Sequence, residues 1–190
     1  MIGKKIDGIE VSNAVKNILK NAVEKLKSEN VIPCLATILV GDNLASATYV
    51  KNKHKACEVV GIKTKDYKLS AEITQEQLND VIDKLNRDKE VHGILVQLPL
   101  PNQLDEFATV SSIFPIKDVD GLTPQNMGLL SMGKSILKPC TPSGIMEMFY
   151  YYKIGIEGKS VVIINRSNLI GKPLYNLLLQ NNATVITCHS

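Results

Sequence analysis

The chain has 190 residues, of which 44% are hydrophobic and 22% charged, with a formal net charge of +3 at pH 7. This composition is typical of globular proteins, and the chain is long enough for one large domain or two small ones. No block of five or more like charges occurs, no run approaches the ~18 apolar residues of a membrane span, and the first residues lack an apolar signal region. We therefore expect a soluble cytoplasmic protein with no nucleic-acid partner and no membrane partner.

The cysteines predict neither a disulfide framework nor a metal site. Cys34, Cys57, Cys140 and Cys188 are widely separated, and none forms a C-x-x-C pair or clusters with a histidine. Cys34 and Cys188 lie in apolar runs typical of buried strands. We interpret them as reduced core thiols of a cytosolic protein.

The first part of the chain predicts helices alternating with buried strands. Apolar residues follow helical spacing from Val11 to Leu26, and an almost continuous apolar run from Ile32 to Val40 predicts a strand. Buried strands joined by helices of this kind predict right-handed crossovers and a mainly parallel α/β sheet. The elements expected next are a helix with Ser46 as N-cap that ends at Gly61, a strand at 64–69, a helix opened by the capping box Thr74-x-x-Gln77, and a strand at 91–98.

The second part predicts a separate, smaller unit. Prolines and an irregular stretch follow residue 98, and Thr141 is interpreted as the N-cap of a linker helix with Pro142 at its first position. Residues 158–190 then have the length and pattern of one βαβ unit, with Pro173 near the start of its helix. A dinucleotide-binding fold needs two βαβαβ halves. We expect domains at 1–140 and 141–190, the second an incomplete Rossmann-type domain, and a chain that is part of a longer protein.

Three side chains are candidates for catalysis. Tyr49 and Lys53 are four residues apart, which places a phenol and an amine on one face of the predicted helix. Gln97 follows a buried strand, at the edge where α/β proteins place ligand groups, and the Pro99-Leu-Pro101 segment leaves the sheet there. A glutamine in this position can hold a lysine in one rotamer. Taken singly, Lys53 is more simply a solvated helix lysine, and Gln97 is more simply a residue that caps the strand edge.

Asp118 and Asp120 stand two residues apart in an irregular segment before Gly121. This spacing suits a turn, a cation site, or recognition of a ring with adjacent N–H donors, because one carboxylate can accept two parallel hydrogen bonds. An Asx-type turn is the simplest interpretation of the pair by itself.

The turn from Asn165 to Gly171 lies between a predicted strand and a predicted helix, where backbone N–H groups and the helix dipole can receive a pyrophosphate. It departs from the G-x-G-x-x-G fingerprint. The acidic residue that binds the adenine ribose of NAD is expected about twenty residues on, where this chain has Cys188-His189-Ser190. No carboxylate repels a 2′-phosphate there, and Arg166 and Ser190 can bind one. The sequence therefore predicts NADP over NAD, with a plain turn and a surface arginine as the alternative.

Five motifs follow one another along the chain: Tyr49-x-x-x-Lys53, Val96-Gln-Leu-Pro-Leu-Pro101, Lys117-Asp-Val-Asp-Gly121, Pro139-Cys-Thr-Pro142 and Arg166-Ser-x-x-x-Gly171-x-Pro173. Together they closely resemble the bifunctional methylenetetrahydrofolate dehydrogenase/methenyltetrahydrofolate cyclohydrolase family, the FolD type. The resemblance implies a two-domain, homodimeric enzyme of one-carbon metabolism and purine biosynthesis that binds tetrahydrofolate and NADP on two walls of a cleft. It would oxidise 5,10-methylenetetrahydrofolate with NADP and hydrolyse the methenyl product to 10-formyltetrahydrofolate.

The resemblance also implies residue roles. Lys53 is the general acid/base and polarising group, Gln97 positions it, and Tyr49 stacks on or orients the folate. Asp120 anchors the pterin ring. The implied cofactor-binding residues are Asn165, Arg166, Ser167 and Ser190, and no metal is implied.

One residue departs from the family pattern. Asn165 stands where the family usually has glycine, so its Cβ is expected to weaken cofactor binding unless the residue adopts a left-handed conformation. The family also continues past residue 190 with further strands of the dinucleotide domain. The alternatives are therefore a non-catalytic or cyclohydrolase-only folate-binding fragment, a dehydrogenase without hydrolase activity, and an amino-acid or shikimate dehydrogenase of similar layout.

Overall fold

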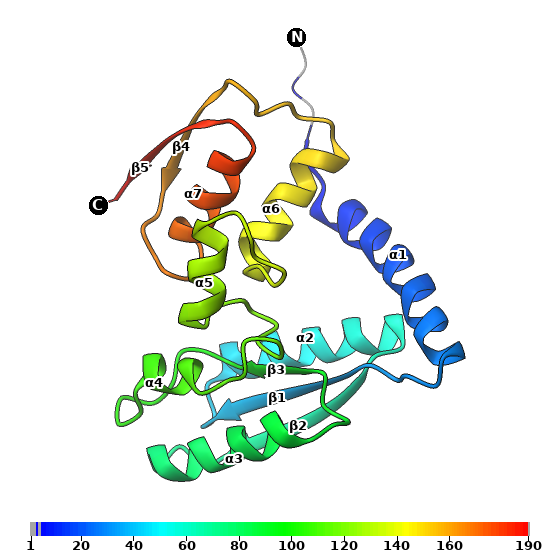
Figure 1. Ribbon diagram of the computed structural model, residues 1–190, viewed down its shortest axis with the longest axis vertical. Helices are drawn as coiled ribbons and strands as arrows, with labels where there is room; N and C mark the ends of the chain where they lie inside the picture. The colour runs from blue at the N-terminus through cyan, green and yellow to red at the C-terminus, as the bar shows by residue number, and fades with distance from the viewer. Residues whose placement is uncertain (1–2, 4, 190) are drawn as a thin grey trace. The chain divides into compact units, whose positions relative to one another are not determined.

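The computed structural model describes residue 3 and residues 5–189. The chain divides into two compact units, one formed by residues 15–119 and the other by residues 1–14 together with 120–190. Each unit contains its own parallel sheet (Figure 1). The parallel α/β architecture expected from the sequence is confirmed.

The sheet of residues 15–119 has the strand order β2-β1-β3, formed by β1 (Cys34–Val40), β2 (Lys63–Leu69) and β3 (Gly93–Val96). All of its pairs are parallel, and Thr37 in β1 is aligned with Asp66 in β2 and Leu95 in β3. A single parallel bridge between Ile94 and Asp118 continues the sheet beyond β3. The carboxyl ends of the strands therefore meet at one edge.

Helices α2 (Leu44–Val60) and α3 (Gln75–Arg87) cover opposite faces of this sheet (Figure 1). The chain moves from β1 to β2 in one direction and from β2 to β3 in the other, and right-handed crossovers in opposite directions place their helices on opposite faces. The short helix α4 (Glu106–Ser111) follows β3. The main core lies under α3 and includes Ala36, Ile38, Val40, Leu78, Ile82, Leu85, Ile94 and Val96.

The helix ends show which capping predictions hold. The capping box of α3 is confirmed: Gln77 N donates to Thr74 Oγ1 (3.2 Å), and Thr74 N donates to Gln77 Oε1 (3.0 Å). The prediction that Ser46 is the N-cap of α2 is wrong. Asn43, not Ser46, is its N-cap, and the Asn43 Oδ1 accepts from Ser46 N (3.0 Å). Three residues earlier in the chain, Asn43 already supplies the side-chain acceptor that the first turn needs.

The other unit contains α5 (Pro124–Ser131), α6 (Cys140–Tyr151) and the predicted βαβ unit, which is confirmed as β4 (Ser160–Ile164), α7 (Gly171–Gln180) and β5 (Thr184–Cys188). Thr141 is not an N-cap, because α6 already begins at Cys140 after Pro139 and has no side-chain cap. A small core joins these elements: Leu130, Met146, Ile163, Leu174, Leu177, Leu178 and Ala183.

The two-stranded sheet buries only one of its faces within the described part of the chain. Ile163 packs against α7, whereas its neighbour Ile164 is 81% exposed. Cys188 is aligned with Ile164 and is exposed, so its predicted burial was wrong, while that of Cys34 is confirmed. Burial raises the pKa of the Cys34 thiol, which keeps it protonated and unreactive.

Helix α1 (Gly8–Ser28) begins in the unit that contains α6. Asp7 N donates to Tyr152 Oη (3.0 Å), and the hydroxyls of Tyr151 and Tyr152 donate to Glu10 (2.8 and 2.7 Å). These bonds attach the amino end of α1 to the end of α6. Among the described residues, no helix is long and apolar enough to cross a membrane.

Candidate functional site

Helix α2 presents Lys53 toward the sheet. Its buried residues Ser46, Val50 and Val60 are separated by about one and three helical turns, and the half-buried Lys53 falls on the same stripe. Tyr49 lies one turn before Lys53 and is 65% exposed. Of the phenol and the amine predicted to share one face of this helix, the tyrosine is therefore mostly exposed to solvent and the lysine is half-buried against the sheet.

Gln97 lies directly after β3, at the carboxyl edge of the sheet. Its backbone N donates to Ile38 O (2.9 Å), and its Nε2 donates to Leu98 O (2.7 Å). Its Oε1 is buried and has no hydrogen-bond partner among the described residues, so Lys53 does not donate to it in this conformation. The structure leaves an acceptor here for an incoming donor.

The chain leaves the sheet after Gln97, as the prolines predict. The Leu98–Pro99 peptide bond is cis, and Leu100 N donates to Glu106 Oε1 (2.8 Å) at the start of α4. This side-chain bond fixes the path of the Pro99-Leu-Pro101 segment next to Gln97.

The Lys117–Gly121 motif is held along β3 by its first residues. Lys117 Nζ donates to the carbonyls of Leu85 (3.0 Å) and Asp88 (2.7 Å) at the end of α3, and burial lowers the pKa of Lys117. Ile94 N donates to Lys117 O (2.7 Å), and Asp118 is 1% exposed. Asp120 follows the Ile94–Asp118 bridge by two residues and is half-buried.

Gly93 makes this close approach possible. A Cβ at position 93 would overlap Cγ1 of Val119, so any larger residue would push the motif away from β3. Lys117 and Asp118 are therefore structural parts of the motif, whereas Asp120 lies where the segment departs from the sheet.

In the other unit, the turn between β4 and α7 is organised by Asn165. Its Oδ1 accepts from Ser167 N (2.8 Å) and Gly171 N (3.1 Å), and Ser167 Oγ accepts from Ile170 N (3.0 Å). Asn165 is not in the left-handed region. A Cβ at Gly171 would overlap the carbonyl oxygen of Asn165, so glycine is required where the helix begins against the strand.

Several N–H groups at the amino end of α7 have hydrogen-bond partners within the chain. Gly171 N is bonded to Asn165, Lys172 N donates to Ser167 O (3.1 Å), and Leu174 N donates to Ile170 O (2.9 Å). Pro173 has no N–H. Several N–H groups of the turn predicted to receive a pyrophosphate thus already have partners within the chain.

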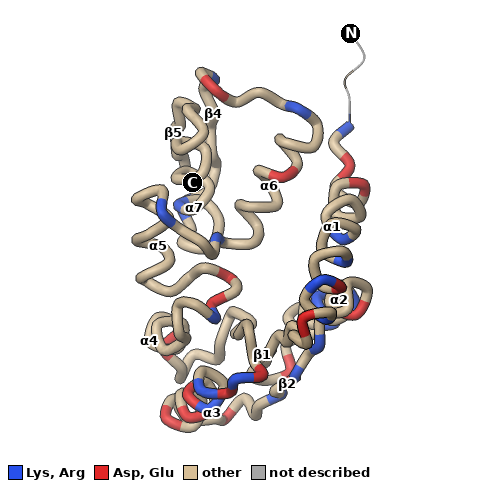
Figure 2. Tube along the Cα trace, turned by 45° about the vertical axis from the view of Figure 1, so that its right-hand side comes forward, with Lys and Arg blue, Asp and Glu red and all other residues tan. Residues whose placement is uncertain are grey.

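Arg166 and His189 lie next to each other, after the carboxyl ends of β4 and β5. Arg166 Nη1 lies 3.4 Å from His189 Nε2, and both residues are exposed. From Gly158 to Ser190 the chain has no Asp or Glu, whereas Lys159, Arg166 and Lys172 are basic (Figure 2). This charge pattern suits a phosphate-bearing ligand. Ser190 lies outside the described residues, and His189 is a neighbour of Arg166 to which we assigned no role from the sequence.

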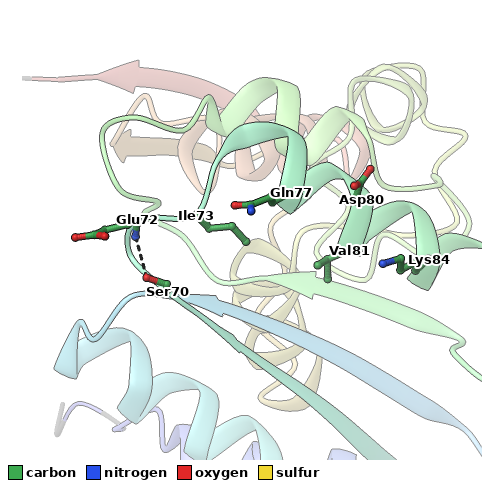
Figure 3. Close-up of a pocket in the computed structure, with 7 residues that line it drawn as sticks. All are labelled: Ser70, Glu72, Ile73, Gln77, Asp80, Val81 and Lys84. Carbon is green, nitrogen blue, oxygen red and sulfur yellow. Dashed lines mark hydrogen bonds between the residues drawn. The ribbon is translucent and has the colours of Figure 1, made fainter.

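Two surface hollows lie away from these residues. One, of about 420 Å³, runs along α3 on the sheet face opposite α2 and is lined by Ser70, Glu72, Ile73, Gln77, Asp80, Val81 and Lys84 (Figure 3). Another, of about 500 Å³, lies at the amino ends of β1 and β2 and includes Cys34, Lys63 and Lys65. Neither contains Lys53 or Gln97. Within the described part of the chain, no group of three or more His, Cys, Asp or Glu is arranged to hold a metal ion.

The fold and these residues define a two-part α/β protein with a polar strand edge in one part and a βαβ turn suited to a nucleotide in the other. Residues 6–120 match the tetrahydrofolate dehydrogenase/cyclohydrolase catalytic domain, and residues 139–190 match the NAD(P)-binding domain of the same family. The chain therefore belongs to the tetrahydrofolate dehydrogenase/cyclohydrolase family.

Individual relatives support the assignment. The chain is 67% identical to a bifunctional protein FolD of Nitrosopumilus maritimus over 190 residues, which cover all of this chain and 66% of that protein. A FolD crystal structure from Campylobacter jejuni is 49% identical with a TM-score of 0.95, covering 97% of this chain and 66% of that one. A Trypanosoma brucei FolD complexed with NADP and an inhibitor is 37% identical with a TM-score of 0.92, covering 96% and 63%. The chain thus spans slightly less than two thirds of these relatives.

Proposed function

We propose that this protein oxidises 5,10-methylenetetrahydrofolate with NADP and hydrolyses the resulting methenyl cation to 10-formyltetrahydrofolate, as a step of one-carbon metabolism. In the first reaction a hydride passes from the methylene carbon to NADP. In the second, water adds to the cation and a proton is released. The observation that carries the proposal is the half-buried Lys53 on the sheet-facing stripe of α2, together with the buried Oε1 of Gln97, which has no hydrogen-bond partner in the described part of the chain.

The hydrolysis requires a group that gives and takes a proton close to the reacting carbon. Lys53 is that group, and Gln97 Oε1 orients its ammonium. Tyr49, which is exposed one turn earlier, orients the folate ring. Asp120 anchors the pterin through paired hydrogen bonds. Hydride transfer between two bound rings depends mainly on positioning, so it depends less on Lys53.

We propose that the βαβ unit, which has no Asp or Glu from residue 158 to residue 190, binds the cofactor. Arg166, Ser167 and Ser190 bind phosphate groups of NADP, and Asn165 shapes the turn that carries them. NADP is preferred over NAD because no carboxylate stands at the end of β5 to repel the 2′-phosphate. When bound, NADP supplies the hydride acceptor.

The family resemblance further supports a cytoplasmic homodimer that serves purine biosynthesis. It also supports a functional division at residue 140: residues 1–140 form the folate-binding catalytic domain, and residues 141–190 form the linker helix and the first part of the NADP-binding domain.

The test is the absorbance change after mixing the protein with 5,10-methylenetetrahydrofolate and either NADP or NAD, followed by methenyltetrahydrofolate alone. NADP-dependent reduction together with hydrolysis is the expected result. Lys53→Met should lower the hydrolysis rate by about 10²–10⁴-fold and damage the dehydrogenase less. Lys55→Met, on the exposed side of α2, is the matched control and should retain both rates. Equal losses of both activities in Lys53→Met would show that Lys53 mainly binds substrate.

The alternative is a folate-binding cyclohydrolase that does not reduce NADP, and the match of residues 139–190 to the NAD(P)-binding domain of the family does not favour it. The same assay separates the two, because this candidate hydrolyses methenyltetrahydrofolate without reducing either cofactor. A folded protein that does neither, yet binds folate, would be a binding module.

A further inference from the structure

Thr37 is a buried polar residue that the proposed mechanism does not use. It lies in the middle of β1, is 1% exposed, and its Oγ1 is buried without a hydrogen-bond partner among the described residues. An unpaired buried hydroxyl destabilises a protein, so such a group calls for an explanation. Gln97 Oε1 is also buried and has no hydrogen-bond partner among the described residues.

Strand alternation places Thr37 on the face of the sheet that α2 covers. Its neighbours Ala36 and Ile38 point into the core under α3, and side chains of successive strand residues point to opposite faces. Leu95, aligned with Thr37, and Gln97, two residues further along, therefore share the face of Thr37. Thr37 Oγ1 and Gln97 Oε1, neither of which has a hydrogen-bond partner among the described residues, thus lie on the same side of the sheet, one in β1 and the other directly after β3.

A contact from α2 locates the helix over this row of residues. His54 Nε2 lies 2.8 Å from Asp66 Oδ1, and Asp66 is the β2 residue aligned with Thr37. The turn of α2 that contains His54 thus lies above the row formed by Asp66, Thr37 and Leu95. Lys53 is the residue before His54 and belongs to the sheet-facing stripe.

We propose that Thr37 is a positioning residue for Lys53: its hydroxyl and Gln97 Oε1 each accept one N–H of the Lys53 ammonium when folate is bound. An ammonium has three donors and no acceptor, so two fixed acceptors leave the third N–H for the substrate. The inference rests on the proposed function, because it assigns Thr37 a part in the same lysine-dependent step. It gives a role to a buried hydroxyl at a position where valine would fill the same space.

Thr37→Val removes the hydroxyl at nearly constant volume, and Thr37→Ser keeps it. With Thr37→Val, kcat for methenyltetrahydrofolate hydrolysis should fall about tenfold, with KM within about twofold and no loss of thermal stability. Thr37→Ser should restore most of kcat. In a Lys53→Met background, Thr37→Val should change the residual dehydrogenase rate no further, because the group that it positions is absent.

Thr109→Val is the matched control. Thr109 is also fully buried, but its Oγ1 accepts from Gln75 Nε2 (3.0 Å), so this variant should lose stability and keep kcat. Unchanged kcat in Thr37→Val, or a loss that Thr37→Ser does not reverse, would overturn the proposal.

A second measurement does not depend on turnover. In protein labelled with ¹³C at lysine Cε and mixed with folic acid as a non-reacting probe, the Lys53 signal, assigned by its loss in Lys53→Met, should report an ordered side chain. It should become mobile in Thr37→Val and stay ordered in Thr37→Ser. If the wild type binds folic acid without hydrolysing methenyltetrahydrofolate, the proposed function fails and this measurement alone decides the role of Thr37. A Lys53 signal equally mobile in all three proteins, or a wild type that binds no folate, would overturn it.

Discussion

Replacing Asn165 with alanine removes the oxygen that accepts Ser167 N (2.8 Å) and Gly171 N (3.1 Å) in the turn before α7. Each such bond contributes about 0.5–1.5 kcal/mol net. Because the two amides share one acceptor, we expect Asn165→Ala to lower the free energy of unfolding by about 2 kcal/mol. For a chain of this length the melting temperature should then fall by about 4–8 °C.

Urea unfolding followed by circular dichroism measures the change, and an unaltered m-value would show that the compactness of the two states is unchanged. Asn165→Asp is the matched control, since the carboxylate keeps the acceptor and its charge is favourable at a helix amino end. It should be at least as stable as the wild type. If NADP phosphates bind at this turn, the same variant should bind NADP more weakly through charge repulsion. An alanine variant as stable as the wild type, or an aspartate variant as unstable as alanine, would refute the role of Asn165 as the acceptor that stabilises the turn.

Two further predictions concern the ion pair between Lys65 and Asp88 and the attachment of α1. The hydrogen bond from Lys65 Nζ (2.9 Å) holds the pKa of Asp88 below its usual value, so its stabilisation is present above about pH 4 and is lost as the pH falls through the lowered pKa. Asp88→Asn should therefore be less stable than the wild type at pH 7, and the difference in melting temperature should shrink toward pH 2; a constant difference would contradict the linkage. Glu10→Ala removes the acceptor for the hydroxyls of Tyr151 and Tyr152, so amide exchange in the first turn of α1 should accelerate, whereas exchange in α3 should not. Equal exchange in α1 of both proteins would show that these exposed bonds contribute nothing measurable.

Local sequence determined most elements of this protein. The apolar spacing of α3 and its Thr74–Gln77 box lie within a few residues of each other, so the helix start could be predicted without knowing what packs on it. The same holds for the apolar run of β1 and for the helix stop at Gly61, where the backbone has a left-handed φ of 84°. The sequence also indicates Lys53, Gln97 and Arg166 as candidate site residues, because each lies in a short motif and these motifs follow one another along the chain.

Tertiary structure decided what these residues contact. Cys188 and Ile164 resemble buried strand residues in sequence, yet are exposed because one face of the β4-β5 sheet is uncovered in the described residues. Thr37 is indistinguishable from any strand threonine until the alignment of β1 with β2 and the contact between His54 and Asp66 place it beneath the turn of Lys53. The sequence identified Asn165 only as a departure from glycine, whereas the structure shows that its Oδ1 is the acceptor that organises the turn. Periodicity and caps depend on neighbours in the chain, whereas burial and hydrogen-bond partners depend on residues that only folding brings together.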